Sequence, residues 1–317
     1  MMHLSRCRIF LLSLSVFAGL LAGACITRAQ DARSKITGIS HMAIYTSDPA
    51  AAEHFYGEEL GAAKESDPEN PQGTVYRFSA EQFIEVLPLP AQHSISRLDH
   101  VAFAITDAAA LHAYLMSHHY TDIEAVTKGS DGSQWFFARD PEGNRVQFYQ
   151  SATHPFHTTE TLVSPRIIHV GFLVKDRATE DHFYRDLLGF RPYWYGSMQP
   201  GKLDWVAQQV PDGHDWLEYM MTGSGSDSGP ADGVDARQLG VMNHFSLGVP
   251  NMEKAVTELY ASEAIRFSPR HDGPTMGKDG KWQANLYDPD GTRVELMEFQ
   301  PVIKPCCSDF TAASPSN

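Results

Sequence analysis

Cysteine is scarce in this chain of 317 residues. Cys7 and Cys25 lie near the N-terminus, and Cys306 and Cys307 are adjacent near the C-terminus. Two residues in a leader and one neighbouring pair beyond the last predicted strand cannot form a disulfide framework. We therefore expect the hydrophobic core to stabilise this fold.

Positive charge is also in short supply. Lys and Arg together number 25 against 39 Asp and Glu, which gives a net charge of −14 with both signs scattered along the chain. Nucleic-acid binding needs clustered basic side chains, so the composition argues against a nucleic-acid partner. The apolar run from Ile9 to Ala24 is short for a membrane span, and we expect none.

That apolar run has the flanks of a secretory signal peptide. Arg6 and Arg8 precede it, and the small-x-small pattern ending at Ala29 follows it, so residues 1–29 are predicted to be removed. The mature protein is then expected to be periplasmic or secreted. Cys25 has a lipoprotein-like context, but the Leu expected three residues earlier is missing, and we favour cleavage over lipidation.

A nine-residue motif occurs twice and indicates an internal repeat. The two copies are Asp140-Pro-Glu-Gly-Asn-Arg-Val-Gln-Phe148 and Asp288-Pro-Asp-Gly-Thr-Arg-Val-Glu-Leu296. Pro and Gly favour a tight turn, and the alternation that follows is typical of a strand. Gln147 stands in the first copy where Glu295 stands in the second.

Four predicted strands each carry one histidine on the face opposite their apolar residues. A small residue follows two positions after each histidine, which leaves space above the strand, as in the lining of a cup. The pairs are His41 with Ala43, His100 with Ala102, His169 with Gly171, and His244 with Ser246.

Each of these strands leads into a predicted helix with an Asp or Asn at its N-cap, and each unit closes with a strand bearing one polar residue. The helices are predicted over Ala50–Leu60, Ala108–Ser117, Arg177–Leu188 and Met252–Ser262, and the closing polar residues are Glu85, Gln147, Glu218 and Glu295. The chain thus reads as four βαβββ units, at residues 36–90, 95–150, 166–222 and 239–300. Residues 151–165 and 223–238 are predicted linkers, and residues 301–317 a disordered tail.

The four βαβββ units resemble the vicinal oxygen chelate superfamily, which includes glyoxalase I, extradiol ring-cleaving dioxygenases and bleomycin-resistance proteins. The resemblance implies an α+β fold of two tandem glyoxalase-like domains, residues 36–150 and 166–300, each with a cup-shaped mixed sheet. Units of this superfamily pair one with two and three with four, or one with four and two with three. We favour sequential pairing, because a complete ligand set then falls within one half.

The resemblance also implies one divalent metal ion, of Zn, Ni, Mn, Co or Fe, held by residues of the first and last strands. The complete set is His169, Glu218, His244 and Glu295. A second, weaker site is implied at His41, Glu85, His100 and Gln147, because an amide is a neutral ligand. A lone strand histidine is ordinarily a hydrogen-bonded core or surface residue, but four at matching positions favour ligands.

Three functions follow from the resemblance. We slightly favour an exported enzyme of the glyoxalase I type, a lyase or isomerase that acts on a small substrate with vicinal oxygens through a metal-bound enediolate, with Glu218 or Glu295 as base. The alternative is an extradiol dioxygenase, in which His169, His244 and Glu295 bind Fe(II) and a catechol. The third is a non-catalytic protein that sequesters a ligand. We expect a monomer or homodimer.

Smaller features bear on the site. His214 could serve the dioxygenase reading as an acid-base residue, but its Pro-Asp-Gly-His context favours a surface turn. Trp194, Tyr195, Trp205 and Trp216 are candidates for an aromatic wall. The loop residues Arg270, His271, Lys278 and Lys281 would either meet an anionic substrate or be solvated.

Overall fold

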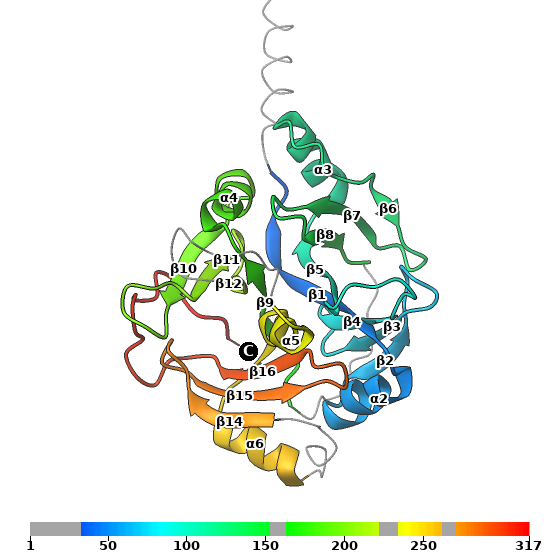
Figure 1. The fold of residues 1–317 in the computed structure, drawn as a ribbon. Helices are drawn as coiled ribbons and strands as arrows, with labels where there is room; N and C mark the ends of the chain where they lie inside the picture. The colour runs from blue at the N-terminus through cyan, green and yellow to red at the C-terminus, as the bar shows by residue number, and fades with distance from the viewer. Residues whose placement is uncertain (1–32, 153–162, 222–233, 262–270, 317) are drawn as a thin grey trace, which may run out of the picture.

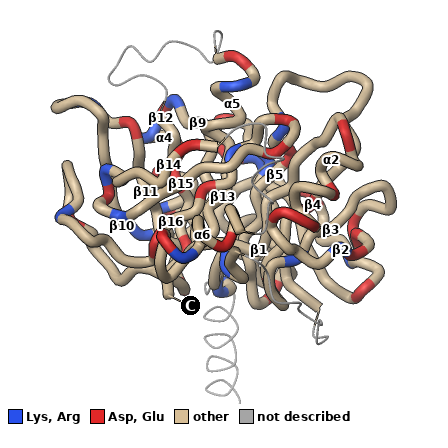
Figure 2. Tube along the Cα trace, turned by 90° about the horizontal axis from the view of Figure 1, so that it is seen from below, with Lys and Arg blue, Asp and Glu red and all other residues tan. Residues whose placement is uncertain are grey.

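The computed structural model describes residues 33–152, 163–221, 234–261 and 271–316 (Figure 1). The predicted signal peptide, Cys25, Arg270 and most of both predicted linkers lie outside these ranges. Within them, no helix combines the length and apolar character needed to cross a membrane. Acidic and basic residues are spread over both halves of the molecule (Figure 2).

Two eight-stranded sheets dominate the described residues. The first has the order β2-β3-β4-β1-β5-β8-β7-β6, and the second the order β10-β11-β12-β9-β13-β16-β15-β14. The strands of the first sheet are β1 (Ile36–Thr46), β2 (Ala63–Ser66), β3 (Thr74–Arg77), β4 (Phe83–Pro88), β5 (Leu98–Ile105), β6 (Thr127–Lys128), β7 (Gln134–Arg139) and β8 (Arg145–Gln150). Those of the second are β9 (Ile167–Val174), β10 (Arg191–Gly196), β11 (Trp205–Gln209), β12 (Trp216–Met221), β13 (His244–Val249), β14 (His271–Met276), β15 (Trp282–Tyr287) and β16 (Arg293–Glu298).

Strand pairing confirms the predicted α+β fold of two tandem domains. Within each unit the first strand pairs in parallel with the last, as β1 does with β4 and β9 with β12. Consecutive units join through their first strands, which run antiparallel, β1 beside β5 and β9 beside β13. Sequential units therefore share a sheet, and the four strands that carry the predicted ligands become its centre.

The helices begin where their caps predict. Asp48, Asp107, Asp176 and Asn251 each accept backbone N–H hydrogen bonds from the first helical turn. The helices are α2 (Pro49–Glu53), α3 (Ala108–Ser117), α4 (Arg177–Asp181), α5 (Ala236–Met242) and α6 (Met252–Ala261).

Two features of the helices differ from the prediction. In the first and third units the α-helix widens after α2 and α4 into the π-helical turns η1 (His54–Glu59) and η2 (His182–Leu187). The helix α5 begins inside the predicted linker, because Asp235 and Gln238 form a reciprocal capping box that starts it.

One continuous apolar core fills the space between the two sheets. It contains Met42 and Phe103 from the first sheet and Val170 and Phe245 from the second. The histidine-bearing faces therefore point away from this shared core, each into its own cup. Alternation with Val170 and Phe172 predicts that Ile168 also faces this core. Ile168 belongs instead to the smaller apolar cluster that contains Trp216, because an irregularity in the β9–β13 pairing interrupts the alternation.

Residues 301–316, predicted to be a disordered tail, make defined contacts with the second domain. The peptide N–H of Thr311 donates to the carbonyl of Tyr193 on β10 at 3.0 Å, and the Phe310 ring packs 4.9 Å from the Tyr193 ring. The tail thus provides a hydrogen-bond donor to the edge strand β10 and packs an aromatic ring against it. We call residues 301–316 the C-terminal strap.

Candidate metal centre

Strand register places the predicted ligands around the small residues that the sequence singles out. Gly171 on β9 lies between Glu218 on β12 and His244 on β13. Ser246 on β13 lies between His169 on β9 and Glu295 on β16. A Cβ atom at position 171 would come within 2.2 Å of the His244 imidazole, so glycine provides the room for that ring.

Three of the four predicted ligands of the second domain converge: His169, Glu218 and His244 offer ligand atoms that all lie within 4.8 Å of one another, and Glu295 joins them beside His169. The Nε2 atoms of His169 and His244 are 3.1 Å apart, and Glu295 Oε2 lies 3.1 Å from His169 Nε2. Glu218 Oε2 is 3.4 Å from His244 Nε2 and 4.0 Å from His169 Nε2. Ligands that bind one ion at about 2.0–2.3 Å lie at such separations from one another, so this geometry fits a shared divalent cation.

The surroundings orient both imidazoles. His244 Nδ1 hydrogen-bonds the carbonyl of Met242 at 2.8 Å, which leaves Nε2 to face the centre. His169 is fully buried, and its ring stacks on Trp216 at a centroid distance of 4.6 Å. Burial lowers the pKa of His244, which favours the neutral form that binds metals.

The two carboxylates differ in basicity. Burial alone would raise the pKa of Glu295, but Arg293, whose Nη1 is 3.6 Å from Glu295 Oε1, and His169 outweigh it and bring the pKa to about 2. Burial raises the pKa of Glu218, and the negative charge of Glu295 adds to this, although His169 opposes both. Glu295 is therefore held as an anion, and Glu218 is the stronger base.

The first domain holds a similar cluster. The Nε2 atoms of His41 and His100 are 3.1 Å apart, and Glu85 Oε2 is 3.6 Å from His100 Nε2. Asp99 holds His100 Nδ1 at 2.7 Å and is itself paired with Arg145 at 2.7 Å. Such a carboxylate behind a histidine is typical of metal ligands.

Gln147 has a partner that the sequence reasoning missed. Its amide nitrogen donates to Glu69, which lies in the loop between β2 and β3. In the described part of the chain, Gln147 Oε1 and Glu85 Oε2 are buried without a hydrogen-bond partner. Two unpartnered oxygens beside two imidazole nitrogens are a donor set that fits a cation. Burial, and after it the neighbouring Asp67 carboxylate, raise the pKa of Glu85 to about 11, so its carboxyl is protonated unless a cation is bound.

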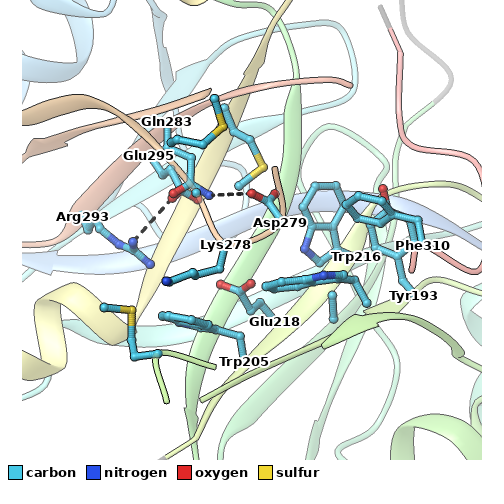
Figure 3. Close-up of a pocket in the computed structure, with 16 residues that line it drawn as sticks. Tyr193, Trp205, Trp216, Glu218, Lys278, Asp279, Gln283, Arg293, Glu295 and Phe310 are labelled. Atoms are coloured by element: carbon cyan, nitrogen blue, oxygen red, sulfur yellow. Dashed lines mark hydrogen bonds and ion pairs between the residues drawn. The ribbon is translucent and has the colours of Figure 1, made fainter. Parts of the chain in front are cut away.

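A cavity of about 260 Å³ opens beside the second-domain cluster (Figure 3). Glu218 and Glu295 face it together with Arg293, Lys278 and Asp279. Its aromatic walls are Tyr193, Trp194, Trp205, Trp216 and Phe310. This volume lies just below the usual range for ligand pockets, roughly 300–1,000 Å³, so the cavity suits a small substrate.

Some of the remaining candidate residues line the cavity as predicted, and others do not. Trp194, Trp205 and Trp216 line the cavity as expected, whereas Tyr195 is 45% exposed and lies outside it. His214 is in an exposed turn before β12, as predicted. Lys278 reaches the cavity and His271 is exposed on β14, whereas Lys281 is completely buried.

The two sheets define a protein of paired βαβββ units. Each cup holds a cluster of His and Glu side chains that is able to bind a metal. Residues 38–148 and 166–296 match the family model described as the Glyoxalase/Bleomycin resistance protein/Dioxygenase superfamily. The chain belongs to this superfamily. A comparison with curated protein sequences gave no significant match.

Solved structures share the fold. A variant of homoprotocatechuate 2,3-dioxygenase from Brevibacterium fuscum aligns with a TM-score of 0.63 and 18% identity, over 84% of this chain and 72% of that one. The same enzyme complexed with 3,4-dihydroxyphenylacetate gives a TM-score of 0.62 and 17% identity, over 84% and 82%. A catechol 2,3-dioxygenase gives 0.58 and 14%, over 90% and 96%. At these identities the likeness concerns the fold alone.

Proposed function

We propose that the second domain is a metal-dependent enzyme that acts on a small substrate with two neighbouring oxygens. The observation that carries this proposal is the convergence of His169, Glu218 and His244, with Glu295 beside His169, next to an aromatic cavity that both carboxylates line. These four residues would hold a divalent cation, which would supply Lewis-acid polarisation of the substrate oxygens.

Within this class we favour proton transfer of the glyoxalase I type. Glu218 is buried, faces the cavity and is the more basic of the two carboxylates, so it is suited to take a proton from a carbon next to a substrate oxygen. Glu295, kept charged by Arg293, is suited to remain a ligand. Lys278 and Arg293 face the same cavity and can stabilise negative charge that develops on the substrate.

The second candidate is extradiol ring cleavage. It is supported by the fold likeness to dioxygenases that act on catechols and by the flat aromatic walls around the cavity. In this reading His169, His244 and Glu295 bind Fe(II). Glu218 Oε2, 3.4 Å from His244 Nε2, is then a surplus carboxylate, which is why we place this function second.

Substitution of Glu218 separates the two functions. The protein is purified without oxygen, its metal is measured, and it is assayed for O₂ uptake with catechols and for turnover of α-oxoaldehyde–thiol adducts. Proton-transfer chemistry requires that Glu218→Gln retain metal but lose turnover, while the exposed control Glu81→Gln is unaffected. Stoichiometric Fe(II) with O₂ uptake in wild type would overturn the lyase proposal, and absence of bound metal after reconstitution would overturn both enzyme functions.

We further propose that the first domain binds a divalent cation more weakly, through His41, Glu85, His100 and Gln147. The unpartnered oxygens of Glu85 and Gln147 support it. Titration with Zn²⁺ should give two sites per chain, and His100→Ala should remove only the weaker one. A single site in wild type that is lost on His244→Ala would contradict this.

Export is a separate proposal, which rests on the predicted signal peptide at residues 1–29. The N-terminal sequence of the protein recovered from a secreting bacterial host should begin near Gln30. Recovery of the uncleaved chain from the cytoplasm of that host would contradict it.

A further inference from the structure

The C-terminal strap lies beyond the family-matched residues, which end at 296 and include β16, and it follows that strand in the chain (Figure 1). Its hydrogen bonds nevertheless join it to both units that line the second-domain cavity. On one side it hydrogen-bonds β10 and β11 of the third unit. On the other it hydrogen-bonds the turn between β14 and β15 of the fourth unit. The bonds are Thr311 N to Tyr193 O at 3.0 Å, Gln209 Nε2 to Ala313 O at 2.8 Å, Cys306 N to Lys278 O at 2.8 Å, and Val302 N to Gly280 O at 2.8 Å.

Between these attachments the strap contributes a wall of the cavity. Phe310 lines it, with its ring centroid 4.9 Å from that of Tyr193 and 6.4 Å from that of Trp194 (Figure 3). The shape of the cavity on this side therefore depends on a segment that is not part of either βαβββ unit.

Behind this wall lies Lys281, which is 0% exposed. Its Nζ has no hydrogen-bond acceptor among the described residues, and it lies 4.8 Å from the ring centroid of Trp216, 5.2 Å from that of Phe310 and 5.8 Å from that of Tyr193. We call these three rings the Lys281 cage. Burying an ammonium without a partner is costly, and cation–π attraction together with the carboxylates of Asp279, Glu295 and Glu218 offsets that cost.

The cage connects the strap to the candidate metal centre. Trp216 contacts Lys281 and also stacks on His169 at 4.6 Å. A continuous series of contacts therefore runs from Phe310 through the Lys281 ammonium and the Trp216 indole to a candidate ligand.

We propose that the C-terminal strap is a specificity-determining wall of the second-domain site, and that Lys281 is the positioning residue that holds it closed. The ammonium attracts both Phe310 and Trp216, so the two walls keep their spacing. A cavity closed in this way accepts the small, flat part of a substrate and excludes larger ring systems. The inferred selection of substrates by size rests on the proposed function. The inferred attachment of the strap through Lys281 does not depend on it.

The attachment is tested by hydrogen–deuterium exchange of residues 301–316 in the full chain. Phe310→Ala and Lys281→Met should speed exchange at the Thr311 and Cys306 amides by about tenfold or more, which corresponds to about 1.4 kcal/mol. Lys281→Arg keeps the positive charge and should retain protection. Val302→Ala, on an exposed strap side chain, is the control. Unchanged exchange in both Phe310→Ala and Lys281→Met would overturn the proposal.

Specificity is tested with two vicinal-oxygen chelators of different size, catechol and 2,3-dihydroxynaphthalene, bound to the Zn²⁺-loaded protein and followed by tryptophan fluorescence. Phe310→Ala should shift the affinity ratio toward the larger chelator by about tenfold or more, and Val302→Ala should not. An unchanged ratio in Phe310→Ala would overturn the proposal. If neither chelator binds wild type, the proposed function fails, and hydrogen exchange still decides the attachment.

Discussion

The hydroxyl of Tyr56, in the first domain, donates a hydrogen bond of 3.0 Å to the carboxylate of Asp288, which is 232 residues away in the second. The pseudo-symmetric pair exists too, with Tyr184 of the second domain 3.2 Å from Asp140 of the first. Both aspartates open the repeated Asp-Pro-x-Gly turns, and both tyrosines belong to π-helical turns. Each domain therefore fixes the turn that leads into the other domain's last ligand strand.

Tyr56→Phe should destabilise the protein. The substitution leaves the buried Asp288 carboxylate without this donor, which costs about 1–3 kcal/mol. Urea denaturation measures the change, and Tyr260→Phe, at a half-exposed side chain, should be neutral. Equal stability of the Tyr56 and Tyr260 variants would contradict a stabilising role for the bond.

Asp288 should also make stability depend on pH. Burial raises its pKa to about 7, above about 3.9 in the unfolded chain, so the folded state binds the proton more tightly. Its contribution is therefore greatest below pH 4 and is lost as the pH rises through 7. With a chelator present, the stability of Asp288→Asn relative to wild type should improve between pH 5 and 8. A constant difference over that range would show that Asp288 does not titrate there.

Gly171→Ala should disrupt the second metal centre without removing a ligand. The added Cβ would lie 2.2 Å from His244 Cε1, so the imidazole must move away from the centre. Zn²⁺ bound per chain should fall by one equivalent. Gly57→Ala, whose Cβ would make an ordinary 3.7 Å contact with Tyr76, is the matched control. Full occupancy in the Gly171 variant would mean that His244 is not a ligand.

Metal binding should stabilise the folded protein. An ion that binds only the folded chain adds about 2.7 kcal/mol at a concentration one hundred times its dissociation constant. Thermal unfolding in Zn²⁺ and in EDTA measures this, and the difference should shrink in a double variant of His169 and His244. A difference that persists in that variant would place the stabilising ion in the first domain.

The sequence by itself determined the units, their fold and two His/Glu clusters able to bind a metal, because these depend on local alternation and on a repeat visible four times. A small residue beside each histidine already marked the cup side, and Gly171 shows why: an imidazole needs that space. The alternation of apolar and polar residues did not predict the side on which Ile168 packs, because the β9–β13 pairing is irregular there.

Tertiary structure alone decided what surrounds those clusters. Glu69, in the loop between β2 and β3, hydrogen-bonds Gln147, and Tyr56 hydrogen-bonds Asp288 across the domain interface. The Phe310 ring contacts Lys281 from a tail predicted to be disordered. No periodicity or motif in the sequence predicts these contacts, because each joins segments that are distant in sequence. Their energy comes from burial and charge that exist only once the two sheets and the strap are packed together.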